Sequence, residues 1–120
     1  MTFSVGTDIV EIGRIKKIID ENKKFITKIF TKIEIEFCEK KKNNKYESYA
    51  ARFAAKEAVY KALSERIIGD YNWTDFEIIN DESGKPRVFL NIKIEGIEGI
   101  EVSLSHSKEY AVAYVMAIFK

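Results

Sequence analysis

The sequence predicts an α+β domain in which a long central helix and shorter helices pack on a mainly antiparallel sheet. Residues 2–10 alternate between larger apolar and small or polar side chains, which is typical of a strand. Alanines recur at every fourth position between residues 50 and 62, which is the spacing of one helical face. From residue 76 onward the pattern becomes extended, with a polar turn at residues 81–86. This order of strand, helices and strands is the basis of the prediction.

Length and composition restrict the class of protein. A chain of 120 residues with 46% hydrophobic and 32% charged residues has the size and composition of one globular domain. We therefore expect a single domain spanning residues 1–120. The formal net charge of +1 indicates no general attraction to nucleic acid or membranes. The sequence shows no membrane-length apolar run and no signal peptide, and its lone cysteine, Cys38, cannot form an internal disulfide, so we expect a cytoplasmic protein.

The first strand has two different faces, and a helix follows it. The two faces carry Phe3, Val5, Thr7 and Ile9 on one side and Ser4, Gly6 and Asp8 on the other. Isoleucines then recur at helical spacing among lysines, which predicts an amphipathic helix. These isoleucines are Ile12, Ile15, Ile18 and Ile19.

Two further helix starts are indicated by capping patterns. Residues 31–34 read Thr-Lys-Ile-Glu, which fits a capping box and predicts a short helix toward Lys40. Residues 40–45 form a polar, lysine-rich loop. Asn44, with a glutamate three residues later, resembles a second cap and predicts a long helix that ends near Leu63.

The remaining third of the chain is expected to form strands separated by turns. Alternation and turn residues place these strands at 76–80, 87–92, 102–105 and 110–119, with connections at 81–86 and 106–109.

The long helix carries the most informative pattern. Its alanines leave one face with almost no side-chain bulk, so this face can lie very close to a sheet or another helix. They are Ala50, Ala54, Ala58 and Ala62. The neighbouring face carries Phe53, Glu57 and Lys61. We interpret this helix as one that presents charged groups from a tightly packed backbone.

Asp8 and Glu57 are the candidate metal ligands. Asp8 ends the first strand on its small-residue face, although it could instead cap a helix beginning near Ile9 or Val10. Glu57 could instead form only an exposed pair with Lys61 one turn later. Two carboxylates and a lysine suggest magnesium bound to a phosphate, because magnesium takes oxygen ligands from carboxylates, water and substrate phosphates.

His106 is the only histidine, and it stands between Ser105 and Ser107. A lone histidine is more often structural, but the flanking hydroxyls and a nearby lysine favour contact with an anion. The Gly84–Pro86 turn is most simply a hairpin, and its glycine would also let the backbone approach a ligand. Cys38 is assigned no role.

Taken together, these segments resemble the holo-acyl-carrier-protein synthase family of phosphopantetheinyl transferases. The most specific matches are Gly-Thr-Asp-Ile-Val-Glu-Ile at residues 6–12 and the Phe-Ala-x-Lys-Glu-Ala-x-x-Lys-Ala core of the long helix. The full set comprises residues 6–15, 30–38, 52–63 and 103–113, with Gly84–Pro86 as a further element. The matches follow the family's order over nearly the whole chain.

The resemblance implies transfer of phosphopantetheine from coenzyme A to a serine of an apo acyl carrier protein. It implies magnesium at Asp8 and Glu57, and catalytic roles for Glu57, Lys61 and His106. The positions that it implies for binding coenzyme A are Arg52, Lys61, Gly84, Lys85, Pro86, His106 and Ser107.

The resemblance also implies two protein partners. Members of the family are typically homotrimers with sites between subunits, and they bind acidic carrier proteins through a basic first helix. Arg14, Lys17 and Lys24 are the corresponding residues here, although they could simply form a solvated basic face. One segment departs from the family, because residues 64–69 lack the usual Gly-Thr-Gly loop. Arg66 in that segment is a hypothetical substitute ligand for a phosphate.

Two other classes of function remain open on the sequence. The first is a binding module that has kept the fold and lost turnover. The presence of all four site residues argues against it: Asp8, Glu57, Lys61 and His106. The second is a nucleic-acid binder that uses the lysines of the first helix and of residues 40–45. The near-neutral charge and the lack of aromatic residues among those lysines argue against it.

Overall fold

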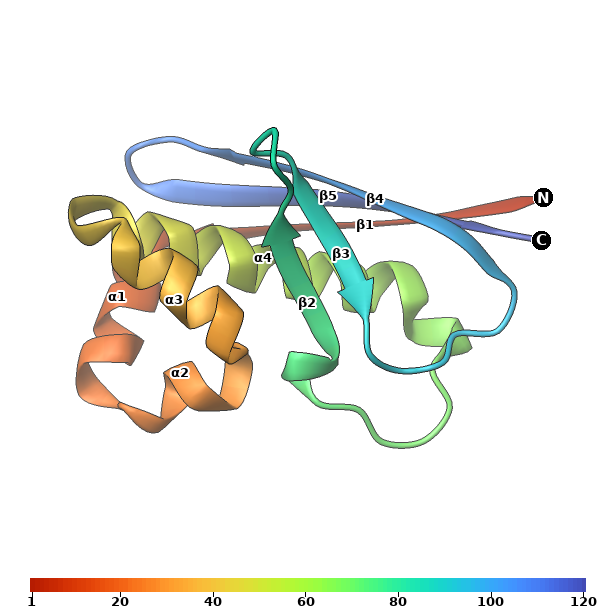
Figure 1. Cartoon of the computed structure of the whole chain (residues 1–120), viewed down its shortest axis with the longest axis horizontal. Coiled ribbons are helices and arrows are strands. Elements are labelled where there is room, and N and C mark those ends of the chain that lie inside the picture. The colour runs from red at the N-terminus through yellow and green to blue at the C-terminus, as the bar shows by residue number, and fades with distance from the viewer.

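A three-stranded antiparallel sheet with a long helix running along it forms the centre of the structure (Figure 1). The computed structural model describes all 120 residues. The strand order is β1 (Thr2–Glu11), β5 (Tyr110–Phe119) and β4 (Ile97–His106), so the last strand lies in the middle. Because Thr2 pairs with Phe119, the two ends of the chain lie side by side. The predicted α+β class is confirmed.

Along the chain, the helices follow β1 and precede the later strands. They are α1 (Ile12–Glu21), α2 (Lys24–Ile29), α3 (Lys32–Lys40) and α4 (Lys45–Leu63), with short 3₁₀ turns η1 (Lys42–Asn44), η2 (Ser64–Arg66) and η3 (Trp73–Asp75). The isoleucine face of α1 is buried against the rest of the protein, as its spacing predicts. No helix has the length and apolar character that would allow it to cross a membrane.

The strands β2 (Phe76–Asn80) and β3 (Pro86–Leu90) form a separate hairpin. The sequence predicts these strands correctly but gives no sign that they leave the main sheet. The hairpin crosses α4 in the view of Figure 1, and β2 packs directly against α4. The helix is therefore covered by the three-stranded sheet on one side and by the hairpin on another.

The alanine face of α4 packs closely against β1, where the sequence predicts a close contact with either a sheet or another helix. Ala50, Ala54, Ala58 and Ala62 are all buried. Gly6 of β1 lies so close to this face that a Cβ atom there would stand 2.0 Å from the carbonyl oxygen of Ala58. Only glycine fits at this position, and the contact fixes the height of the strand above the helix.

The predicted helix caps are partly confirmed. Thr31 and Glu34 form the capping box at the start of α3. The Asn44 side chain forms no capping bond, although α4 does begin at the next residue. The first helix starts at Ile12, so Asp8 lies within the strand and caps nothing.

The outer face of the sheet is unusually apolar. Phe3, Val5 and Ile9 are 57%, 54% and 62% exposed, and the tyrosine rings of Tyr110 and Tyr114 are also open to solvent. The register pairs Thr7 with Tyr114. The two tyrosines of β5 therefore lie on the same side of the sheet as the exposed apolar side chains of β1, away from α4. An apolar patch of this kind commonly marks an interface between proteins.

Candidate active site

A cavity of about 250 Å³ lies between β1, α1 and α4, and Asp8 and Glu57 both line it. Arg14 and Phe53 line the same cavity, and the rest of its wall is aliphatic: Ile9, Val10, Ile15 and Ile18. The structure therefore brings the two predicted metal ligands to one place, although they are 49 residues apart in sequence. The contact between Gly6 and Ala58 is the reason, because Asp8 and Glu57 lie close to it on their respective elements.

Lys61 completes this group of charges. Its ammonium group donates to the carbonyl oxygen of Thr7 at 2.9 Å and lies 3.4 Å from Oδ1 of Asp8. The side chain is half exposed, so the ammonium can also contact a ligand from solvent. The predicted row of Phe53, Glu57 and Lys61 on one face of α4 thus leads from the apolar wall of the cavity to the open lysine.

Burial raises the pKa of Glu57, and the negative charge of Asp8 raises this pKa further, while Lys61 lowers it in part. The carboxylates of Asp8 and Glu57 therefore repel each other, and burial adds to the cost of charging Glu57. A bound cation would relieve this repulsion, so the residues present fit a divalent metal ion.

The raised pKa predicts how Glu57 affects stability. A carboxyl whose folded pKa lies above its unfolded value loses stabilising free energy as pH rises from the unfolded to the folded pKa. With a chelator present, Glu57→Gln is therefore expected to have a higher Tm than the parent protein at pH 7. The gain should vanish below the ordinary pKa of 4.5, where the carboxyl is protonated in both states. Thermal unfolding across this pH range tests the prediction, and a variant less stable at pH 7 would contradict it.

Two of the residues predicted to bind coenzyme A, Arg52 and His106, lie together on the opposite flank of α4, beside β4. A cavity of about 280 Å³ there is lined by Lys41, Glu47, Arg52 and His106, among others. His106 ends β4, and its Nδ1 atom lies 3.6 Å from a carboxylate oxygen of Glu47. Because β1 and β4 are the two edges of the sheet, one chain does not bring His106 together with Asp8 and Glu57.

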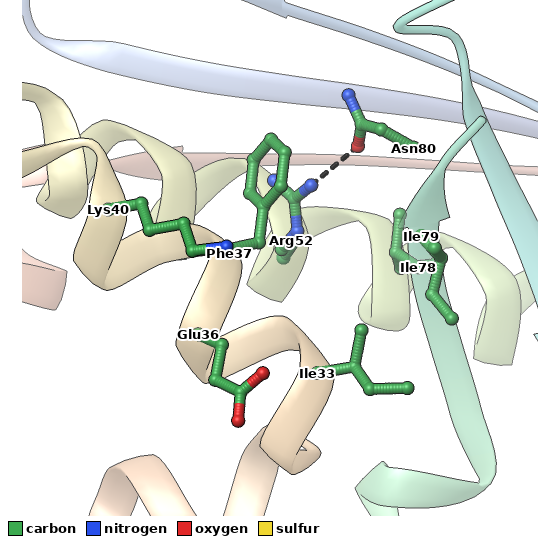
Figure 2. A pocket seen from close by; sticks show the side chains of 8 residues that line it. All are labelled: Ile33, Glu36, Phe37, Lys40, Arg52, Ile78, Ile79 and Asn80. Carbon is green, nitrogen blue, oxygen red and sulfur yellow. Dashed lines mark hydrogen bonds between the residues drawn. The ribbon is translucent and has the colours of Figure 1, made fainter. Parts of the chain in front are cut away.

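Arg52 is a buried cation without a carboxylate partner. It is only 3% exposed, and it takes part in none of the ion pairs of the chain. Figure 2 shows its guanidinium group beside the Phe37 ring and bonded to Asn80. The ring centroid lies 4.1 Å away, the bond to Oδ1 of Asn80 is 2.6 Å long, and the Nε atom has no partner. Burial lowers the pKa of Arg52, while the nearby Cys38 and Glu34 raise it in part, although neither forms a hydrogen bond or ion pair with the guanidinium group.

The glycine–lysine–proline segment forms the hairpin turn between β2 and β3, as predicted. Gly84 has a φ of +88°, which favours glycine, and its carbonyl oxygen accepts a bond of 2.9 Å from Asn80. Asn80 thus connects the turn to Arg52. Lys85 lies 3.6 Å from Glu101, and Ser107 closes the turn between β4 and β5 by accepting a bond from the amide of Tyr110.

The three predicted carrier-binding residues do not share one environment. Arg14 lines the cavity that holds Asp8 and Glu57, whereas Lys17 and Lys24 are exposed beyond it. Arg66 lies elsewhere: it stacks on the Phe119 ring at 3.9 Å, at the end of the sheet near the termini. Arg66 also lines a small cavity with Lys93, and its role as a phosphate ligand stays a prediction.

The sequence reasoning missed a buried ion pair between Lys56 and Glu34. The capping box alone accounts for a glutamate at position 34, so its second role as the partner of Lys56 is not evident from the local sequence. A signal was present, because Lys56 stands among alanines and valine on the buried side of α4. Cys38, to which no role was assigned, is buried, and burial raises the pKa of its thiol to about 12.

An acidic pair beside a lysine, with an apolar wall and a separate basic cavity, is an arrangement that suits proteins that transfer phosphorylated groups. Residues 4–115 match the sequence pattern of the family described as the 4'-phosphopantetheinyl transferase superfamily. The chain belongs to this superfamily.

Relatives and solved structures of one kind resemble the chain over its whole length. The holo-[acyl-carrier-protein] synthase of Ruminiclostridium cellulolyticum is 49% identical over 97% of the chain and 92% of the relative. That of Chloroherpeton thalassium is 46% identical over 93% and 94%. The crystal structure of the Bacillus anthracis holo-(acyl-carrier-protein) synthase in complex with CoA (3',5'-ADP) superimposes with a TM-score of 0.79. It is 38% identical and covers 95% of this chain and 94% of that one.

Proposed function

We propose that residues 1–120 form a single holo-acyl-carrier-protein synthase domain. It transfers phosphopantetheine from coenzyme A to a serine of an apo acyl carrier protein and releases adenosine 3',5'-bisphosphate. The close relatives named above support this activity. The observation that carries the proposal is the cavity shared by Asp8 and Glu57, with Lys61 beside it.

Asp8 and Glu57 would hold a magnesium ion. The chain has no cluster of three or more histidine, cysteine, aspartate or glutamate side chains that could bind a metal, so water and substrate oxygens would complete the ligand set. When bound, the ion would supply charge stabilisation at the diphosphate of coenzyme A. Lys61 would neutralise a further oxygen of that diphosphate.

Glu57 is our first candidate to accept the proton of the attacking serine. It lines the cavity in which the serine would approach the diphosphate, and it would accept the proton directly or through a water molecule on the metal ion. The chain places no nucleophile in the cavity lined by Glu57, and none is needed, because phosphoryl transfer depends mainly on positioning and charge.

The basic cavity would hold the nucleotide end of coenzyme A. Arg52 is buried, lacks a counter-ion and lines this cavity with Lys41 and His106, so an anionic ligand would supply the missing charge. Ser107 follows His106 directly and would add a hydroxyl group. The Gly84–Pro86 turn, tied to Arg52 through Asn80, would form the neighbouring wall.

One coenzyme A molecule needs both groups of residues, and a single chain holds them on opposite flanks of α4. We therefore propose a homotrimer in which the acidic cavity of one subunit faces the basic cavity of the next. The apolar outer face of the sheet, which includes Phe3, Val5 and Ile9, supplies a surface for this association.

Val5→Glu is expected to dissociate the assembly and reduce activity by at least about tenfold, because a buried charge opposes association and leaves each site incomplete. Sedimentation velocity and turnover are measured on the same sample. Ile68→Glu is the matched control, since Ile68 is 92% exposed and lies outside the sheet. If the Val5→Glu protein keeps both the mass of the assembly in sedimentation and its activity, the outer face of the sheet is not the surface through which subunits associate.

Carrier binding should depend on salt more strongly than coenzyme A binding. Arg14, Lys17 and Lys24 would contact the acidic carrier over an exposed surface, where added salt screens charge. Raising ionic strength should therefore increase KM for the carrier more than KM for coenzyme A. Charge reversal at Lys17 should make KM for the carrier less sensitive to ionic strength. If KM for the carrier of the parent protein does not change with ionic strength, this basic surface does not bind the carrier.

The activity itself is tested by mixing the protein with coenzyme A, magnesium and an apo carrier protein. The molecular mass of the carrier is then measured by mass spectrometry. A gain of one phosphopantetheine group supports the enzyme. A carrier that binds with unchanged mass would support the binding module instead. Binding to neither carrier nor coenzyme A, with retention on nucleic acid, would support the nucleic-acid binder.

A further inference from the structure

A fully buried ion pair joins the helices to the hairpin. Lys56 and Glu34 are both 0% exposed, and Nζ of Lys56 lies 2.8 Å from Oε1 of Glu34. The same ammonium donates to the carbonyl oxygens of Trp73 at 3.1 Å and Phe76 at 2.6 Å. All three N–H bonds of the ammonium are thus used, each toward a different segment.

Glu34 is equally well satisfied. Its Oε1 atom accepts a bond from the amide of Thr31 at 2.9 Å, and its Oε2 atom accepts one from the amide of Ile78 at 2.8 Å. The network therefore fixes the start of α3, the middle of α4, η3 and β2 relative to one another. A buried ion pair adds little stability over apolar side chains of the same shape, but its directional bonds specify one geometry.

The network reaches the acidic cavity through aromatic rings. Lys56 holds the backbone of Trp73, and the Trp73 ring stacks on Phe53 with centroids 5.7 Å apart and planes 27° apart. Phe53 in turn lines the cavity together with Arg14 and Glu57. Lys56 and Glu57 are neighbours on α4, so the network acts close to the acidic group without touching the cavity.

We propose that Lys56 and Glu34 are positioning residues for the transfer reaction: through Trp73 they hold Phe53 in place as the wall that receives the carrier protein. This inference rests on the proposed function, in which Arg14, a residue of the same cavity as Phe53, contacts the carrier protein. A looser wall would misplace the carrier's serine relative to Glu57.

Trp73 is the only tryptophan, so its fluorescence reports directly on this segment. The double variant Lys56→Met/Glu34→Gln removes the pair without leaving a lone buried charge. We expect its folded state to show red-shifted emission and greater quenching by acrylamide. In steady-state assays KM for the apo carrier should rise about tenfold, and by a larger factor than KM for coenzyme A. Phe53→Leu, which leaves the network intact, should reproduce the rise in KM for the carrier.

Val102→Ala is the matched control, since Val102 lies in the core on β4 away from the network. It should lower Tm without changing tryptophan emission or either KM. The proposal is overturned if the double variant keeps parental emission, or if Phe53→Leu leaves KM for the carrier unchanged. It is also overturned if Val102→Ala produces the same shifts. If the parent protein modifies no carrier, the proposed function is contradicted instead. The two failures can be told apart because the fluorescence measurement requires no turnover.

Discussion

Replacing Glu57 by glutamine is expected to reduce transfer by about 10³-fold or more, because several kcal/mol of charge stabilisation at the diphosphate would be lost. Glutamine keeps the size of the side chain and one acceptor oxygen, but it removes the charge that holds a divalent ion and the group that accepts the serine proton. The fold should persist, since Glu57 lies at the side of a cavity and forms no bond that holds the elements together. Turnover is followed by the mass of the carrier at saturating magnesium.

Glu65→Gln is the control for this experiment. Glu65 lies in η2, directly after α4, and it is exposed, so its replacement should leave turnover unchanged. Circular dichroism and Tm establish that both variants are folded. Full activity of Glu57→Gln would show that the metal assignment is wrong.

Gly6→Ala is expected to have the largest effect on stability, about 3 kcal/mol, because overpacking against a rigid backbone cannot be relieved by moving a side chain. The new Cβ atom would stand 2.0 Å from the carbonyl oxygen of Ala58 and 2.9 Å from the amide nitrogen of Ala62. Strand β1 must therefore shift away from α4. Asp8 would move with it, so transfer should fall as well. Urea unfolding measures the loss of stability.

Gly13→Ala is the matched control for this variant. Gly13 lies in the first turn of α1, and a Cβ atom there would have no other atom within 4 Å. The substitution should raise stability by about 0.5–1 kcal/mol, because alanine loses less conformational entropy in a helix than glycine does. If Gly6→Ala were as stable as Gly13→Ala, the close approach of β1 and α4 would not be the basis of the site.

Local patterns predicted most of the helices and strands, but not α2 or the first half of β4. The alternation of β1, the alanine spacing of α4 and the capping box at Thr31 each depend on neighbours in sequence, and all three are confirmed. The position of Asp8 beside Glu57 follows from the same two patterns, because only a bare helical face admits Gly6 so closely.

The features that the sequence did not predict depend on contacts between distant segments. Nothing in residues 76–90 indicates that the hairpin leaves the main sheet. The pair of Lys56 and Glu34 joins residues 22 positions apart in sequence, and it is recognised only once both are seen to be buried. The separation of His106 from Asp8 follows from the strand order β1-β5-β4, which places the two residues at opposite edges of the sheet.

The most direct test of the central claim is a crystal structure of the protein with coenzyme A and Mn²⁺, which can replace magnesium and is identified by its anomalous scattering. We expect one metal peak bonded to carboxylate oxygens of both Asp8 and Glu57 and to the diphosphate of the donor. The same donor should reach Arg52 and His106 of a neighbouring subunit. A bound donor whose metal ion contacts neither carboxylate would contradict the account.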